Sequence, residues 1–198
     1  SIHVAPTGSD DSLSMGACYF LAKEKSKALE NIYLGQNLFK NQKKTSSYIK
    51  KYFGNKKFVV RKNISTKKIG ELLKKGEIIA LAHGKEEFGA RALGNRSIIA
   101  NPSDYGVVKK INEMIKSRDF WMPFALTILE EKHKAFLDNS KNLSCEYMTM
   151  GFDVKKSKVK KIIAGCHPYD KTVRPQILKK VRNESYYNLI KSFYRLTG

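Results

Sequence analysis

The sequence is poor in cysteine, in histidine and in long apolar runs, and each shortage excludes a class of protein. The three cysteines, Cys18, Cys145 and Cys166, are odd in number and far apart, which excludes a disulfide framework and a C-x-x-C metal site. The four histidines show neither H-x-x-x-H nor H-E-x-x-H spacing, so the sequence contains no self-sufficient metal motif. No apolar run approaches the ~20 residues that span a bilayer, so we expect a protein of the reducing cytoplasm with no membrane partner.

Acidic residues are also scarce relative to basic ones. The chain has 38 lysines and arginines against 18 aspartates and glutamates, a net charge of +20. Such a charge favours polyanionic partners, either nucleic acid or small phosphorylated ligands. A lysine-biased composition on solvated faces explains the same excess, and both interpretations stay open. With 198 residues, 41% of them hydrophobic, the chain can form one well-buried domain and a small appendage.

The order of apolar and polar segments predicts an α/β fold. Small and apolar residues over 13–21 predict a helix that Ser9, Asp10 or Asp11 can cap, and the lysine-rich residues 23–56 predict a linker and a domain boundary. The chain opens on strand-like residues 2–4, as if cut from a longer protein. Beyond the linker, strands are expected at 58–60, 77–82, 97–100, 124–129, 161–164 and 172–177, and helices at 66–75, 103–116 and 183–196.

The most informative stretch for function is the glycine-rich segment 83–97. Its three glycines permit close backbone approaches, so we expect backbone N–H groups of this loop to reach a bound anion. Arg91 and Arg96 add planar guanidinium groups that suit phosphate or carboxylate. The alternative is a tight surface loop whose arginines pair with Glu86 and Glu87.

Residues 87–97 read E-F-G-A-R-A-L-G-N-R-S, which resembles the E-F-G-P-R-A-L-G-N-R-S signature of the O-carbamoyltransferases of nodulation-factor and antibiotic biosynthesis. A match of this length with a single change is highly specific. The resemblance covers nearly the whole chain. Its other matches are G-S-D-D at 8–11, M-G-A at 15–17, I-N at 111–112, K-S-R-D-F-W-M-P-F-A at 116–125, Y-M-T at 147–149, His167, D-K-T-V-R-P-Q at 170–176 and T-G at 197–198.

The resemblance implies a two-part enzyme of which this chain is the second part. Residues 1–55 would be the end of an N-terminal actin-like ATPase domain plus a linker, and residues 56–198 a C-terminal domain truncated at its end. The C-terminal domain would be similar to threonylcarbamoyl-adenylate synthase, the YrdC-like fold, with a twisted mixed sheet and flanking helices. It would form carbamoyl-adenylate from carbamoyl phosphate and ATP with Mg²⁺. The N-terminal domain, with a divalent metal or iron, would pass the carbamoyl group to a hydroxyl of a small metabolite or sugar.

The matched positions imply the residues of the site. The expected catalytic residues, which would surround carbamoyl phosphate and the adenylate phosphate, are Arg91, Lys116 and Arg174. Further expected binding residues are Arg96, Arg118 and His167. Asp10 is expected to bind a metal whose other ligands lie outside this chain.

Several of these residues have a structural alternative. Lys116 and Arg118 follow an expected helix, and cations are favoured at a helix C-terminus in any case. Arg174 can form an ion pair with Asp170. His167 can be a hydrogen-bonded strand residue that does not face a substrate.

Departures from the family pattern affect what is carried over. Met122 and Leu126 stand where many relatives have an arginine and a second proline, and Ala90 replaces the proline of the signature. The family also continues past T-G into an N-T-S-F-N segment that contacts the nucleotide, so we expect the fragment to be inactive alone. The competing interpretation is a basic RNA-binding module related to tRNA threonylcarbamoylation, although we do not expect nucleic acid to be the partner.

Overall fold

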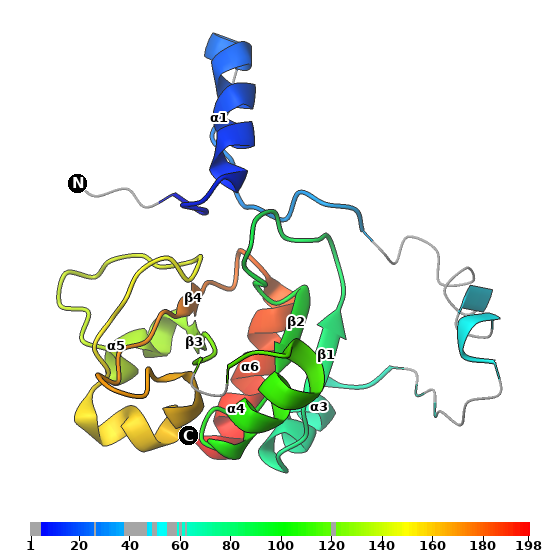
Figure 1. Cartoon of the computed structure of the whole chain (residues 1–198), viewed down its shortest axis with the longest axis vertical. Helices are drawn as coiled ribbons and strands as arrows, with labels where there is room; N and C mark the ends of the chain where they lie inside the picture. The colour runs from blue at the N-terminus through cyan, green and yellow to red at the C-terminus, as the bar shows by residue number, and fades with distance from the viewer. Residues whose placement is uncertain are drawn as a thin grey trace.

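A computed structural model describes residues 5–25, 27–37, 47–48, 51–54, 59, 61, 63–119 and 122–198. The strand-like residues 2–4 and, apart from Val59, the strand expected at 58–60 lie outside the described residues. The described part forms a body of two small sheets with flanking helices, from which one helix projects (Figure 1). Within these ranges no helix is long and apolar enough to cross a bilayer.

The projecting helix, α1 (Asp11–Ala22), buries none of its residues and confirms the first expected helix. Asp10 occupies its N-cap position without a side-chain hydrogen bond. The Asp11 carboxylate accepts hydrogen bonds from the hydroxyls of Thr7 and Ser9, at 2.9 and 3.0 Å. The expected side-chain cap is therefore wrong, because Asp10 at the N-cap position caps no backbone N–H group and the Ser9 hydroxyl donates to the Asp11 carboxylate.

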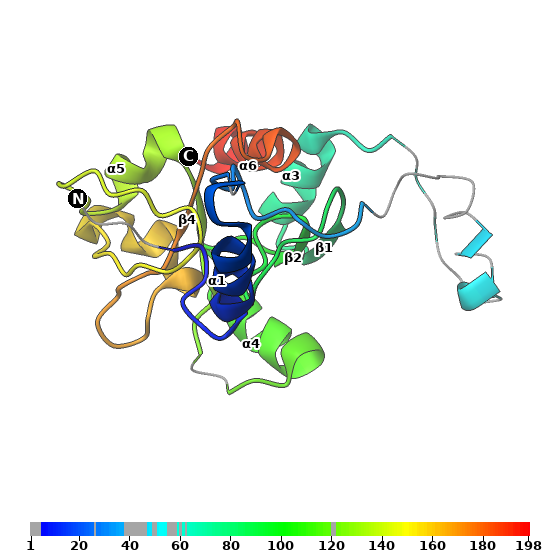
Figure 2. The ribbon, with the colours of Figure 1, turned by 90° about the horizontal axis from the view of Figure 1, so that it is seen from above.

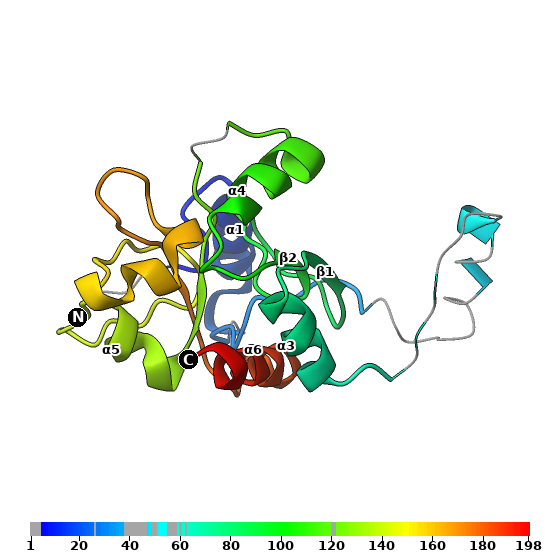
Figure 3. The same cartoon turned by 90° about the horizontal axis from the view of Figure 1, so that it is seen from below.

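Two amphipathic helices, α3 (Thr66–Lys74) and α6 (Glu184–Thr197), pack side by side (Figure 3). Side-chain oxygens of Ser65 and Asn183 cap their N-termini by accepting backbone N–H groups three residues further on. Gly70 allows the close approach, because a Cβ at this position would lie 3.2 Å from a backbone nitrogen of α6. Both helices confirm the helices expected from the sequence.

The four strands form two sheets of two strands each in the described part of the chain. The strands β1 (Ile79–Ala82) and β2 (Arg96–Ile99) are antiparallel, and β3 (Thr127–Leu129) and β4 (Gln176–Leu178) are parallel. The α/β class expected from the sequence is therefore confirmed, with the strands divided between two small sheets.

Helices lie on both sides of the β1–β2 sheet (Figure 2). On one side, Tyr186 of α6 packs in a cluster with Leu81 and Ile99, and the same cluster includes residues of β3 and β4. On the other side, Val107 and neighbouring residues of the next helix pack with Ile98. Successive residues of β2 thus face opposite layers, as a strand requires.

That next helix, α4 (Gly106–Ile111), continues into a π-helical turn, η2 (Asn112–Lys116), and together they confirm the helix expected at 103–116 with a later start. The remaining short helical elements are η1 (Lys23–Lys25), η3 (Glu130–Lys132) and α5 (His133–Phe136).

The strand expected at 161–164 is wrong, because this segment is helical. Two 3-10 turns, η4 (Lys156–Lys161) and η5 (Ile163–Gly165), occupy it. A Cβ at Gly165 would lie 2.3 Å from Cγ of Leu126, so the second turn packs directly against the chain leading into β3. A short apolar run does not by itself distinguish a strand from a buried helical turn.

Candidate functional site

A cavity of about 270 Å³ lies where the N-terminal segment meets the loop between β1 and β2. We call this loop, residues 83–95, the arginine loop. The cavity is lined by residues 6–9, Ile32, residues 88–91, residues 148–149 and Arg174. Arg91 and Arg174 are its charged lining residues, and none of the described aspartates or glutamates lines it. The arrangement favours an anionic ligand.

The backbone of the arginine loop is held by side chains of the loop and of β2. The Glu87 carboxylate accepts hydrogen bonds from the backbone N–H groups of Leu93, Asn95 and Arg96, at 2.7, 2.7 and 3.2 Å. The Gly94 N–H donates to Ser97 Oγ at 2.9 Å. These four N–H groups, of residues 93–96, are therefore not available to a ligand. That backbone N–H groups elsewhere in the loop reach a bound anion stays a prediction.

Arg91 of the loop and Arg96 at the start of β2 have different partners. Arg96 Nη1 donates to the backbone oxygens of His83 and Asn95, at 2.8 and 2.9 Å, and its Nε lies 3.5 Å from Glu86. Arg96 thus ties the loop to the start of β2, and its role in ligand binding stays a prediction. Arg91 is exposed at the cavity, and no described residue forms an ion pair with it. The alternative of a structural pair with Glu86 or Glu87 does not describe Arg91.

Arg174 reaches the cavity from the chain that enters β4. Val173 before it exchanges backbone hydrogen bonds with Phe152, and Pro175 after it is fully buried, so the alternating backbone leaves Arg174 exposed. Asp170, the alternative partner, accepts hydrogen bonds from the backbone and the hydroxyl of Thr172, at 2.9 and 2.8 Å. These two bonds hold the pKa of the Asp170 carboxyl below its usual value.

The N-terminal segment is fixed to the arginine loop by Asp11. Besides Thr7 and Ser9, the backbone of Ala90 hydrogen-bonds this carboxylate. The hydroxyls of Thr7 and Ser9 are the largest causes that hold the pKa of Asp11 below its usual value. Residues 6–9 form a wall of the cavity, and Asp11, bonded to Thr7 and Ser9 of this wall, contacts Ala90 next to Arg91.

Several expected site residues do not line this cavity. Lys116 is exposed at the last residue of η2, and the Arg118 guanidinium lies 6.0 Å from the centre of the Phe124 ring. The Nδ1 of His167 lies 3.2 Å from Asp170. Lys116, Arg118 and His167 stay predictions as ligand-binding residues.

Asp10 is exposed, and in the described part of the chain no three histidine, cysteine, aspartate or glutamate side chains come together to hold a metal. Its role as a metal ligand stays a prediction, because the other ligands were expected outside this chain.

Residues 70–198 match the family described as the carbamoyltransferase C-terminus. The chain belongs to this family. It is 33% and 35% identical, over its whole length, to two proteins of Methanocaldococcus jannaschii, MJ1058 and MJ1051, and 29% identical to the nodulation protein NolNO of Sinorhizobium fredii. The chain spans 33%, 38% and 29% of these three proteins, so it corresponds to about a third of their length.

The cavity is lined partly by residues inside the range that matches the carbamoyltransferase C-terminus and partly by residues before it. Residues 88–91, residues 148–149 and Arg174 belong to the match, whereas residues 6–9 and Ile32 precede it. Sequence reasoning identified both arginines but missed the lining role of Met148 and Thr149. The available signal was the Y-M-T match at 147–149, to which no role was assigned.

Proposed function

We propose that this chain is the donor-binding part of an ATP-using O-carbamoyltransferase and that its cavity binds carbamoyl phosphate. The proposal depends above all on one observation. Arg91 and Arg174, from segments far apart in the sequence, line the same cavity, and none of the described carboxylates forms an ion pair with either.

The chemistry of the cavity suits a small phosphorylated ligand. Carbamoyl phosphate carries a phosphate group whose oxygens two guanidinium groups can bind in bidentate geometry. The apolar lining residues Ile32, Phe88 and Met148 lower the effective dielectric constant around such pairs, which strengthens them relative to water. The side chain of Thr149 adds a hydroxyl that can donate to a carbonyl oxygen or accept from an amide.

The proposed reaction has two stages. In the first stage, water cleaves carbamoyl phosphate into carbamate and phosphate. A carbamate oxygen then attacks the α-phosphorus of ATP, and the bond to pyrophosphate breaks to give carbamoyl-adenylate. In the second stage the acceptor hydroxyl oxygen attacks the carbamoyl carbon and loses its proton, and AMP leaves. Arg91 and Arg174 would neutralise charge on the phosphate oxygens, which is the main protein contribution in phosphoryl chemistry.

ATP, with the Mg²⁺ that accompanies its phosphates, is the proposed co-substrate, and the acceptor is a hydroxyl of a small metabolite or sugar. Lys116 is the proposed cation for the nucleotide phosphates outside the cavity. The described residues contain no group of three histidine, cysteine, aspartate or glutamate side chains that could hold a metal, so none of them acts as a metal ligand in the proposed steps.

The thermal stability of the intact protein tests the proposal. Carbamoyl phosphate should raise the melting temperature, because a ligand that binds only the native state stabilises it by RT ln(1 + [L]/Kd), about 2.7 kcal/mol at 100 times Kd. Arg91→Ala and Arg174→Ala should each remove most of this increase. Their unliganded melting temperatures should stay near that of the wild type, because exposed arginines without ion pairs contribute little to folding.

Arg195→Ala is the matched control, since Arg195 is an exposed arginine on α6 that does not line the cavity. It should keep the full ligand-induced increase. An equal increase in the Arg91, Arg174 and Arg195 variants would show that carbamoyl phosphate does not bind in this cavity.

A further inference from the structure

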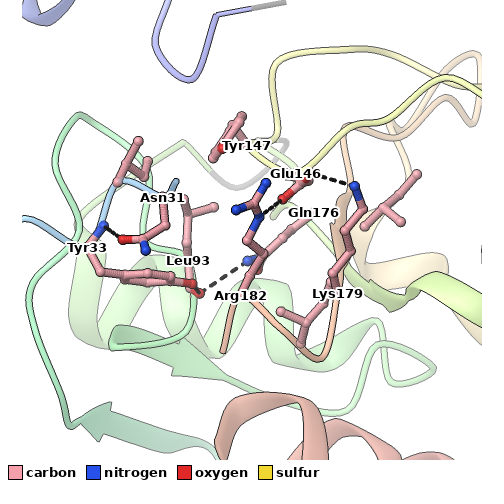
Figure 4. A pocket seen from close by; sticks show the side chains of 11 residues that line it. Asn31, Tyr33, Leu93, Glu146, Tyr147, Gln176, Lys179 and Arg182 are labelled. Atoms are coloured by element: carbon pink, nitrogen blue, oxygen red, sulfur yellow. Dashed lines mark hydrogen bonds and ion pairs between the residues drawn. The ribbon is translucent and has the colours of Figure 1, made fainter. Parts of the chain in front are cut away.

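An ion-pair cluster lies close in sequence to residues that line the cavity, and Figure 4 shows its three side chains. Glu146 Oε1 is 2.7 Å from Lys179 Nζ, and Glu146 Oε2 is 2.7 Å from Arg182 Nε. The Glu146 side chain is only 12% exposed. Burial raises the pKa of Glu146, but the hydrogen bonds from Lys179 and Arg182 outweigh it and hold the pKa below its usual value. We call these three residues the Glu146 clamp.

The clamp links three segments, two of which continue into residues that line the cavity. Glu146 precedes residues 148–149 of the cavity lining, and Lys179 and Arg182 lie between β4 and α6. Arg182 also donates a hydrogen bond to the backbone oxygen of Glu30, close in sequence to the lining residue Ile32. The small pocket that the clamp residues help to line holds only about 10 Å³. This volume is too small for a ligand, so we assign the clamp a structural role.

Directly after the clamp, Met148 adopts a backbone conformation that its side chain disfavours. Its φ is 59°, in the left-handed region, although its side chain is large and only 9% exposed. Such a conformation persists only where the surrounding structure imposes it. Cys145 is held at its carbonyl by the Ile177 N–H at 2.6 Å, so the turn through Met148 starts from a fixed point.

We infer that the Glu146 clamp is a positioning device that holds Met148 in its left-handed conformation and thereby shapes the cavity wall formed by residues 148–149. Glu146 is a positioning residue, because it acts on the ligand through Met148 and Thr149. The inference rests on the proposed function for its ligand, carbamoyl phosphate, but the geometry it describes exists without ligand.

Glu146→Gln tests the inference, because it keeps the shape of the side chain and removes the charge that binds both cations. In the intact protein with ¹³C-methyl-labelled methionine and no ligand, the Met148 resonance should move and broaden in this variant. Met148→Gly assigns that resonance by its disappearance. Glu184→Gln, which breaks the exposed Lys180–Glu184 pair at 3.1 Å, is the control and should leave the resonance unchanged. A sharp Met148 resonance at the wild-type position in Glu146→Gln would overturn the inference.

Affinity for carbamoyl phosphate gives an independent readout. Glu146→Gln should weaken binding about tenfold, the size of change that releasing one strained backbone conformation can produce. In the Met148→Gly background the same change should have less than half of this effect, on a logarithmic scale, because glycine adopts positive φ without strain. An equal loss in both backgrounds would show that Glu146 does not act through Met148.

Two safeguards separate the possible failures. If Glu146→Gln does not fold, Lys179→Gln replaces it as the test variant, because it removes one ion pair of Glu146 and keeps the pair with Arg182. The Met148 resonance should then shift in the same direction by a smaller amount. If wild-type protein fails to bind carbamoyl phosphate, the proposed function is wrong, while the ligand-free resonance still decides whether the clamp positions Met148.

Discussion

Arg91 lies in the arginine loop and Arg96 begins β2 directly after it, and their guanidinium groups have different surroundings. Arg96 is surrounded by backbone oxygens of its own loop, whereas Arg91 lies at the cavity without an ion-pair partner among the described residues. The difference follows from Glu87, whose carboxylate holds the loop backbone and leaves Arg91 outside the turn. Arg91 thus lines the cavity, whereas Arg96 holds the shape of the loop that precedes it.

Gly94 is the residue on which the shape of the loop depends most directly. Its φ is 108°, and a Cβ there would lie 2.2 Å from Cδ1 of Tyr186 on α6. Gly94→Ala should lower the free energy of unfolding by about 3 kcal/mol, since backbone strain and overpacking add. Gly76→Ala is the control, because Gly76 has a φ of 90° with open space around it and should cost only about 1–2 kcal/mol. Equal losses in urea unfolding would show that Tyr186 yields without cost.

At the scale of elements, local signals predicted the helices better than the strands. Periodic apolar residues and the capping side chains Ser65 and Asn183 were sufficient for α3 and α6. The strand expected at 161–164 was wrong, because its apolar run forms helical turns whose packing depends on Leu126, which is distant in sequence. Strand pairing and the division into two sheets also depend on such distant contacts, which no local pattern contains.

Asn183 caps the N-terminus of α6 and also connects this helix to the arginine loop. Its Oδ1 accepts the Tyr186 N–H at 3.1 Å, and its Nδ2 donates to Asn95 of the arginine loop at 2.8 Å. Asn183→Ala should reduce the free energy of unfolding by about 2 kcal/mol, the sum of a lost cap and a buried acceptor left unpaired. Ser65→Ala, the cap of α3 alone, should cost about 1 kcal/mol. Chemical denaturation that ranks Ser65→Ala as the more costly change would contradict the link.

At the scale of the whole molecule, the cavity exists because several distant segments meet. Through a resemblance, the sequence predicted one site for Arg91 of the arginine loop and Arg174 of D-K-T-V-R-P-Q, but not that the G-S-D-D and Y-M-T segments line the same cavity. It placed Lys116 beside Arg91 and Arg174, whereas Lys116 does not line that cavity. The Glu146 clamp could not be predicted either, because its three residues come from segments that only the folded chain brings together.

The measurement that tests the central claim most directly is a calorimetric double-mutant cycle with carbamoyl phosphate on Arg91→Ala, Arg174→Ala and the double variant. Each single change should weaken binding about 10- to 100-fold, the value of a hydrogen-bonded charge. If both arginines bind one phosphate group, the double variant should lose clearly less than the sum of the two single losses on the free-energy scale. Additive losses, or single variants that bind as tightly as the wild type, would contradict a shared anion site.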